Sequence, residues 1–270
     1  MTTRVRLMTN LTVLPYRNPF LLAKSVASLD RVSNGRVTLG VGTGYLKPEF
    51  FALGVDFDER NDLFDEALEV LAMTWSGEPV TYEGRHFSAA GNQLVPVPVQ
   101  QPPPIWIGGS GPRRTLPLVA KHADVWHAWG SPGSLRDANA RVDELAAEAG
   151  RDPASVKVWS CFATVGDHID PERRLMKTVG RLGTYLQGYG DLLVRTNGWD
   201  PAVLERFRAD PVVQSVAGLD MRATTDQLEH VATLLPEQWL ATSATGTPEQ
   251  CVAAIRGQIA LGCDGVILHG

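Results

Sequence analysis

The sequence predicts an α/β protein built on a parallel sheet. Segments typical of strands alternate with segments typical of helices along most of the chain, as parallel strands joined by helical crossovers require. Several strand segments are apolar at consecutive positions, which indicates strands covered on both faces. Six such strands are predicted, and this pattern alone leaves a closed eight-stranded barrel and an open doubly wound sheet both possible.

The first two strands flank a well-marked helix. A strand is predicted over residues 5–14, and Asn18 and Pro19 then provide a helix cap and a first-turn proline. Gly35 ends this helix, and residues 36–41 form the second strand. A long helix follows over residues 58–75, with acidic side chains in its first turn, where they favour the positive end of the helix dipole.

The middle of the chain contains the first of two predicted insertions. Residues 76–103 hold a hairpin over 80–87 and a proline-rich stretch, and they read as an insertion into a single domain that spans residues 1–270. Strands over 104–108 and 123–128 then flank a helix for which Thr115 is the expected cap, with Pro117 in its first turn.

The last part of the chain begins with a helix over 134–149 and a strand over 156–165. Residues 170–243 are mostly helical and form the second predicted insertion, a lid or side subdomain. Thr247 and Gln250 form a capping box ahead of the next helix, and DGVIL at 264–268 is the last strand.

Composition excludes several classes of partner. The 270-residue chain has a net charge of −5 and no long basic run, which argues against binding to nucleic acid or to an anionic membrane. Its three cysteines show no metal-binding spacing, so no metal site is expected. No signal-like N-terminus or long apolar run is present, and we expect a cytoplasmic protein.

A glycine-rich turn follows the strand at 104–108. Gly108, Gly109, Ser110 and Gly111 precede Arg113 and Arg114, just before a helix. Exposed backbone N–H groups, a helix N-terminus and guanidinium groups together suit a phosphate. A tight strand-to-helix turn with two solvated arginines explains the same residues equally well.

Other strand ends carry glycine or polar residues too. Thr9 and Asn10 lie near the end of the first strand, GVGTGY covers 40–45, and His127 ends the strand at 123–128. The glycine spacing is not the GxGxxG of a dinucleotide site, but glycine allows a flat ligand to approach the backbone closely. No nucleophile–base pair or metal motif is present, which suits a cofactor that carries out the chemistry itself.

Three segments give the chain a family resemblance. Residues 4–60, IWIGGSGPRRTLPLVAKHADVWHAWG at 105–130 and ATGTPEQCVAAIRGQIALGCDGVILH at 244–269 resemble the luciferase-like family of flavin- and deazaflavin-dependent oxidoreductases. The resemblance implies a (β/α)8 TIM barrel, of which this chain represents about strands 3–8, so that the first two strand–helix units and the last helix are missing. We therefore expect a fragment, a gene model with a late start, or a barrel completed by a partner chain.

The resemblance also implies roles for individual residues. Thr9 and Asn10 would lie beside the cofactor ring, with a cis peptide at Asn10–Leu11. Binding of the ring, the ribityl chain and the phosphate would involve Gly42, Thr43, Gly44, Gly108, Gly109, Ser110, Gly111 and Arg113 or Arg114.

Tyr45 and His127 are the candidate catalytic residues that supply or take a proton, and Trp129 would help to wall the substrate pocket. Tyr45 stands where deazaflavin-dependent glucose-6-phosphate dehydrogenases have a glutamate, which argues against that activity.

These observations lead to one main functional hypothesis and two alternatives. The first is hydride transfer between the deazaflavin coenzyme F420 and a small organic substrate, by a chain that we expect to be a homodimer. The alternatives are an FMN-dependent monooxygenase that uses O2, and a non-catalytic chain that serves only in assembly. Deazaflavin reacts poorly with oxygen, so oxygen consumption separates the two enzymes, whereas the third binds neither cofactor.

Overall fold

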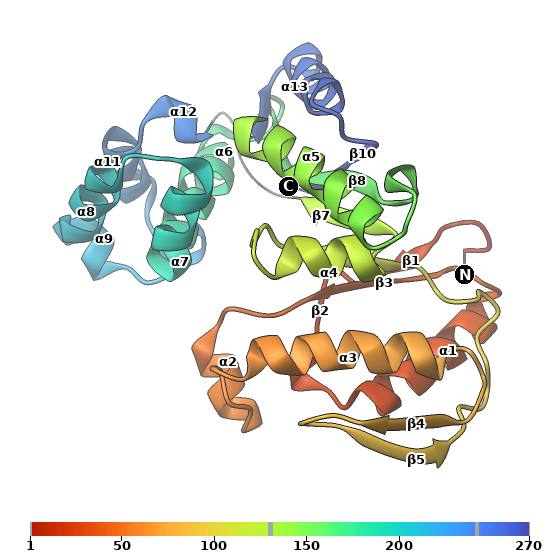
Figure 1. Cartoon of the computed structure of the whole chain (residues 1–270). Coiled ribbons are helices and arrows are strands. Elements are labelled where there is room, and N and C mark those ends of the chain that lie inside the picture. The colour runs from red at the N-terminus through yellow and green to blue at the C-terminus, as the bar shows by residue number, and fades with distance from the viewer. Residues whose placement is uncertain (1, 129–131, 241–242, 270) are drawn as a thin grey trace. The chain divides into compact units, whose positions relative to one another are not determined.

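The computed structural model describes residues 2–128, 132–240 and 243–269 (Figure 1). The chain divides into two compact units. Unit 1 comprises Met1–His127 and Arg141–Lys157, and unit 2 comprises Ala128–Ala140 and Val158–Gly270. None of the helices in the described part of the chain has the length and apolar character that a membrane crossing requires.

Unit 1 contains parallel strands, the helices that connect them and a separate hairpin. In chain order its elements are β1 Leu7–Met8, β2 Thr12–Val13, η1 Leu14–Tyr16, α1 Pro19–Ser33, β3 Val37–Gly42, α2 Lys47–Leu53, α3 Arg60–Thr74, β4 Val80–Glu83, β5 Ser88–Asn92, β6 Ile105–Gly108, α4 Thr115–His122, β7 Val125–Ala128 and η2 Pro153–Ser155. Strand β3 is central, because it pairs in parallel with β1 and β2 on one side and with β6 on the other. Strand β6 in turn pairs in parallel with β7.

The core of unit 1 forms where helix α1 packs against both α3 and β3, and β3 is buried along its whole length. The Trp75 indole N–H donates to the carbonyl of Ala23 at 3.1 Å, joining the end of α3 to α1. Asp30 is fully buried on α1, and its carboxylate accepts hydrogen bonds from the backbone and the side chain of Gln100 at 2.8 and 2.7 Å. These bonds compensate for the burial of the charge and attach the proline-rich stretch to the core.

Several predicted boundaries in unit 1 are corrected by the structure. The predicted strand 5–14 is two short strands, because the segment between them bonds to β3 through the Thr9 side chain instead of a regular ladder. Helix α2 was not predicted, and Pro48 lies in its first turn. Thr115 is the first residue of α4, and the cap position belongs to Arg114.

Helix α5, Pro132–Glu148, begins two residues earlier than expected and is divided between the units. Unit 2 contains β8 Lys157–Gly166, α6 Pro171–Leu175, the π-helical turn η3 Met176–Gly180, α7 Arg181–Asn197, α8 Pro201–Ala209, α9 Pro211–Ser215, α10 Leu219–Arg222, α11 Thr225–Leu234, α12 Glu237–Leu240, β9 Ser243–Gly246, α13 Pro248–Ala260 and β10 Gly265–His269. Strand β8 pairs in parallel with both β10 and β9, and β9 was not predicted.

The helices of unit 2 between residues 171 and 240 lie together in one group (Figure 1). They share a hydrophobic core of their own. Phe207 and Leu228 are among its fully buried members, and Trp199 stacks on Trp239 with ring centroids 4.3 Å apart. The predicted capping box of α13 is confirmed: Thr247 accepts from the backbone N–H of Gln250, and the Gln250 side chain accepts from the backbone N–H of Thr247.

Candidate functional site

The carboxyl ends of the strands in unit 1 form one row of residues. Val13 on β2 is paired with Gly42 on β3, and Gly108 on β6 is paired with His127 on β7. Val41 pairs with Ile107 between these strands, so Gly42 and Gly108 follow one step further along. The structure therefore brings together three of the residues that the sequence singled out, at the edge where parallel α/β proteins bind their ligands.

Thr9 holds the segment between β1 and β2 against β3. Its hydroxyl donates to the Gly40 carbonyl at 2.9 Å and accepts from the Gly40 N–H at 3.0 Å. A Cβ atom at Gly40 would lie only 2.1 Å from the Thr9 carbonyl oxygen, so glycine is required for this close approach. The Asn10–Leu11 peptide is cis, as the family resemblance led us to expect, and Asn10 is exposed.

Leu11 is a candidate site residue that the sequence analysis did not propose. Its side chain covers two glycines of the row, because an added Cβ would lie 3.0 Å from Leu11 Cδ1 at Gly42 and 3.2 Å from Leu11 Cδ2 at Gly108. The Cβ atom added at Gly108 would also lie 3.8 Å from Nδ1 of His127. Leu11 remains 41% exposed, so it presents an apolar surface beside the imidazole. The cis peptide was the one signal that pointed to this residue.

Gly44 and Tyr45 lie where the chain leaves β3. Gly44 has φ +81°, and its close neighbours are Val13 and the Phe50 ring, which leave no room for a side chain. Tyr45 is more than half exposed. It borders Tyr16, whose pKa is raised to about 12 by burial and by its 2.9 Å hydrogen bond to Glu49, with a smaller contribution from Tyr45.

The loop from Gly108 to Arg114 is folded tightly against the start of α4. Gly109 has φ +126°, and its carbonyl accepts a hydrogen bond from the Trp126 indole at 2.7 Å. A Cβ at Gly109 or at Gly111 would lie 3.1 or 3.0 Å from the Thr115 side chain. The glycines are therefore needed for the backbone of this loop, whatever the loop binds.

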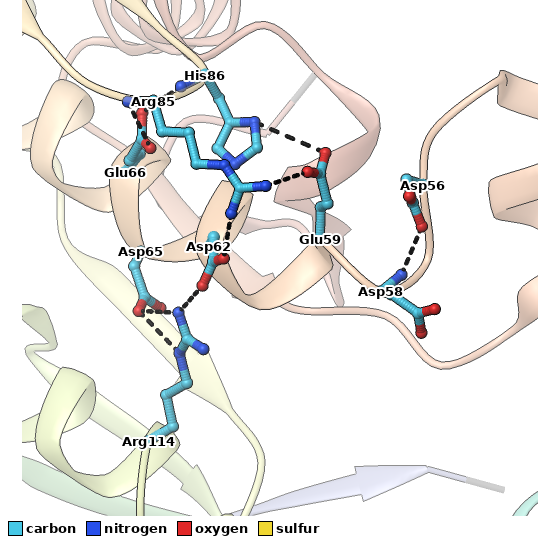
Figure 2. A network of polar contacts seen from close by, with 9 residues as sticks. All are labelled: Asp56, Asp58, Glu59, Asp62, Asp65, Glu66, Arg85, His86 and Arg114. Atoms are coloured by element: carbon cyan, nitrogen blue, oxygen red, sulfur yellow. Dashed lines mark hydrogen bonds and ion pairs between the residues drawn. The ribbon is translucent and has the colours of Figure 1, made fainter.

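The two arginines of this loop have different surroundings. The Arg114 guanidinium is paired with the Asp62 and Asp65 carboxylates on α3 (Figure 2), and its Nε lies 2.9 Å from Asp65 Oδ2. The hydrogen bond from Arg114 holds the pKa of the Asp62 carboxyl below its ordinary value. Burial, in contrast, raises the pKa of the Asp65 carboxyl. Arg113 is exposed and makes no ion pair with any residue that the structure describes.

The β4–β5 hairpin is attached to the same helix. Glu66 on α3 accepts hydrogen bonds from the backbone N–H groups of Arg85, His86 and Phe87 at 3.0 to 3.2 Å. Figure 2 shows those from Arg85 and His86. The Arg85 guanidinium pairs with Glu59 and Asp62. Helix α3 thus anchors both the hairpin and Arg114 through carboxylates spaced three or four residues apart.

Two other residues do not belong to the strand-end row of unit 1. Trp129 falls outside the described residues. His269, at the end of β10 in unit 2, accepts a hydrogen bond from the Arg181 guanidinium at 3.0 Å if its Nδ1 is unprotonated.

The loop and the strand-end row fit a phosphorylated flavin-like cofactor. Arg113 provides a cation without a carboxylate partner among the described residues, the loop ends at the positive end of α4, and Ser110 and Thr115 carry hydroxyl groups. Leu11 provides an apolar surface beside them. This combination of donors and apolar surface suits a phosphate attached to a flat ring.

Comparison with solved structures shows the fold. The F420-dependent tetrahydromethanopterin reductase from Methanopyrus kandleri is 22% identical, with a TM-score of 0.78 over 99% of this chain and 78% of that one. An F420-dependent secondary alcohol dehydrogenase, solved with an F420–acetone adduct, is 22% identical, with a TM-score of 0.71 over 98% and 73%. A riboflavin lyase, solved with modified FMN and riboflavin, is 22% identical, with a TM-score of 0.68 over 99% and 66%.

Sequence comparison shows the family. An uncharacterized protein of Mycobacterium tuberculosis is 32% identical over 151 residues, which are 56% of this chain and 54% of that protein, so the chain spans about half the length of the curated relatives that it matches. The expected α/β fold of the luciferase-like TIM-barrel type is confirmed by the structural matches. A family model described as luciferase-like monooxygenase matches residues 1–265, and the chain therefore belongs to the luciferase-like monooxygenase family.

Proposed function

We propose that this chain takes part in hydride transfer between coenzyme F420 and a small organic substrate. Members of its family are oxidoreductases and monooxygenases, and two proteins of the same fold are described as F420-dependent. The observation that carries the proposal is the row of Gly42, Gly108 and His127 under Leu11, next to a glycine loop with one unpaired arginine among the described residues. This row offers an apolar surface, a phosphate-binding loop and one titratable group.

In this proposal the residues of unit 1 have distinct tasks. The loop Gly108–Gly111 and Arg113 bind the phosphate, and Arg114 holds the loop to α3 through its pairs with Asp62 and Asp65. Thr9, Asn10, Gly42, Thr43 and Gly44 lie along the ring and the ribityl chain. Leu11 excludes water from one face of the ring. When bound, the coenzyme supplies the hydride donor or acceptor.

The proton that accompanies the hydride needs a donor or acceptor on the protein. His127 and Tyr45 are the candidates, because an imidazole or a phenolate accepts a proton and an imidazolium or a phenol donates one. His127 lies in the strand-end row itself, so it is the stronger candidate of the two.

The second candidate is an FMN-dependent monooxygenase. It is favoured by the family description and by the riboflavin lyase of the same fold that was solved with modified FMN. The same loop and Arg113 would hold the FMN phosphate. The phosphate site therefore does not distinguish FMN from F420, which differ in the ring and in the reaction of the reduced cofactor with oxygen. If neither cofactor binds, the third hypothesis, a non-catalytic chain, is supported.

Cofactor titration tests these alternatives. Purified protein is titrated separately with F420 and with FMN, with fluorescence quenching and absorbance shifts as readouts, and oxygen uptake is then measured with the reduced cofactor. We expect F420 to bind and oxygen uptake to be negligible. Arg113→Gln is expected to weaken F420 binding about tenfold, because it removes a charge-assisted hydrogen bond worth roughly 1.5 kcal/mol or more.

Two further variants test this assignment, the first as a matched control for Arg113→Gln. Arg206→Gln removes an exposed arginine on α8 and leaves F420 binding unchanged, and His127→Gln lowers turnover more than F420 affinity. FMN binding with rapid oxygen uptake supports the second candidate instead. The absence of a spectral change with both cofactors contradicts the enzyme proposals.

A further inference from the structure

Three cationic side chains follow one another along a helix of unit 2. Arg174 lies on α6, Lys177 on the π-helical turn η3 and Arg181 at the start of α7. Side chains three and four residues apart lie on the same side of a helix. All three are partly buried, although their immediate neighbour Arg173 is exposed.

None of these three cations forms an ion pair with a carboxylate within residues 2–128, 132–240 and 243–269. The Nε atom of Arg174 is buried and has no hydrogen-bond partner among the same residues. Elsewhere, more exposed arginines such as Arg141 and Arg208 do pair with carboxylates. Asp220 on α10, which packs against η3, is instead hydrogen-bonded to Thr184 at 2.7 Å.

Burial of cations without a counter-charge is unfavourable, because the lost hydration is not replaced. The three charges also repel one another. Such an arrangement is expected where an anion from outside the described chain completes the charge balance.

Two of the three cations, Lys177 and Arg181, act on His269 at the carboxyl end of β10. The Arg181 guanidinium contacts Nδ1 of His269 at 3.0 Å, and His269 is paired with Ala163 on β8. Burial, Arg181 and Lys177, in that order, lower the pKa of His269. Arg181 also favours the thiolate of Cys161, against the larger effect of burial, which raises the pKa of this thiol.

The backbone at Lys177 is unusual in a way that fits a binding site. Residues Met176–Gly180 form a single π-helical turn between two α-helices, and such turns occur frequently at functional sites.

We propose that Arg174, Lys177 and Arg181, together with His269, form a binding site for an oxyanionic group, a phosphate or a carboxylate, of a small-molecule ligand. All four residues of the site belong to unit 2, and none belongs to the glycine loop of unit 1. It does not depend on the cofactor proposed above. It implies that this chain takes an acidic ligand.

Inorganic phosphate is the probe for this site. Thermal unfolding and isothermal titration are measured against phosphate and acetate at constant ionic strength, with chloride as the reference anion. We expect stabilisation by phosphate in wild-type protein. Lys177→Gln and Arg181→Gln are expected to reduce phosphate affinity about tenfold or more, because each removes a hydrogen bond between charged partners.

A second readout separates ligand binding from a merely structural role. Without phosphate, Lys177→Gln is expected to unfold at a higher temperature than the wild type, because it removes an uncompensated charge. Arg173→Gln is the matched control on the same helix, and it leaves phosphate binding unchanged. A lower unfolding temperature for Lys177→Gln in chloride overturns the proposal.

Two further results decide the location and the source of the anion. The proposal is also overturned if phosphate binding is lost in Arg113→Gln but kept in Lys177→Gln and Arg181→Gln, since the anion then binds the glycine loop. If Lys177→Gln also weakens F420 or FMN binding, the oxyanion belongs to the cofactor, and the assignment of the cofactor phosphate to the glycine loop is wrong. If cofactor binding is unchanged while phosphate binding is lost, it belongs to another acidic ligand, and either result supports the site.

Discussion

Replacement of Gly40 by alanine tests the packing that positions the segment before β2. The new Cβ would lie 2.1 Å from the Thr9 carbonyl oxygen and 3.3 Å from its carbonyl carbon. Both atoms belong to the backbone, so no side-chain rotation relieves the contact, and the segment has to move away from β3. That movement stretches both hydrogen bonds between the Thr9 hydroxyl and Gly40.

The expected cost follows from three contributions. Overpacking in a buried region costs about 1–3 kcal/mol, and each weakened hydrogen bond costs up to about 1 kcal/mol. The lower entropy of alanine in the unfolded chain returns about 0.5–1 kcal/mol. We therefore expect Gly40→Ala to lower the free energy of unfolding by about 2–3 kcal/mol, and the Tm by roughly 2–4 °C per kcal/mol.

Denaturant unfolding and calorimetry measure this change, and Gly257→Ala is the control. Gly257 lies inside α13, and nothing lies within 4 Å of the position of an added Cβ. Alanine at that position is expected to raise stability by about 0.5–1 kcal/mol, because it is the better helix former. If Gly40→Ala is as stable as the wild type while Gly257→Ala behaves as expected, the close approach of Thr9 to β3 is refuted.

Three further changes test other parts of the fold. Glu66→Gln removes carboxylate acceptors from the hairpin turn, so amide hydrogen exchange at residues 85–87 should become about tenfold faster; unchanged exchange would mean that these bonds do not hold the hairpin. Thr247→Ala breaks the capping box of α13 and should cost about 1 kcal/mol in denaturant unfolding, whereas Thr247→Ser should be nearly neutral. Burial is the main cause that lowers the pKa of His122 from 6.5 to about 4. Between pH 6.5 and pH 4 the unfolded chain therefore binds a proton that the folded chain does not, and stability should fall as the pH decreases through this range. His122→Gln should flatten that part of the stability–pH curve, and an equally steep curve in the variant would contradict this assignment.

The sequence determined the parts of this protein that depend on neighbouring residues. The Asn18 cap, with Pro19 in the first turn, and the Thr247–Gln250 capping box were predicted because each involves residues at most three positions apart. The parallel α/β class followed from the alternation of apolar strands and helices. The cis peptide at Asn10–Leu11 came from the family resemblance and not from local physics.

Only the tertiary structure decided the contacts between distant positions. Thr9 bonds to Gly40 across 31 residues and interrupts the first predicted strand. Arg114 pairs with Asp62, which is 52 residues away in the sequence. The adjacent Arg113 makes no such pair with any described residue, so the two arginines differ in their surroundings. The physical reason is that a guanidinium or a hydroxyl binds whichever acceptor the folded chain brings within about 3 Å, and that choice is made by packing and not by the neighbouring sequence.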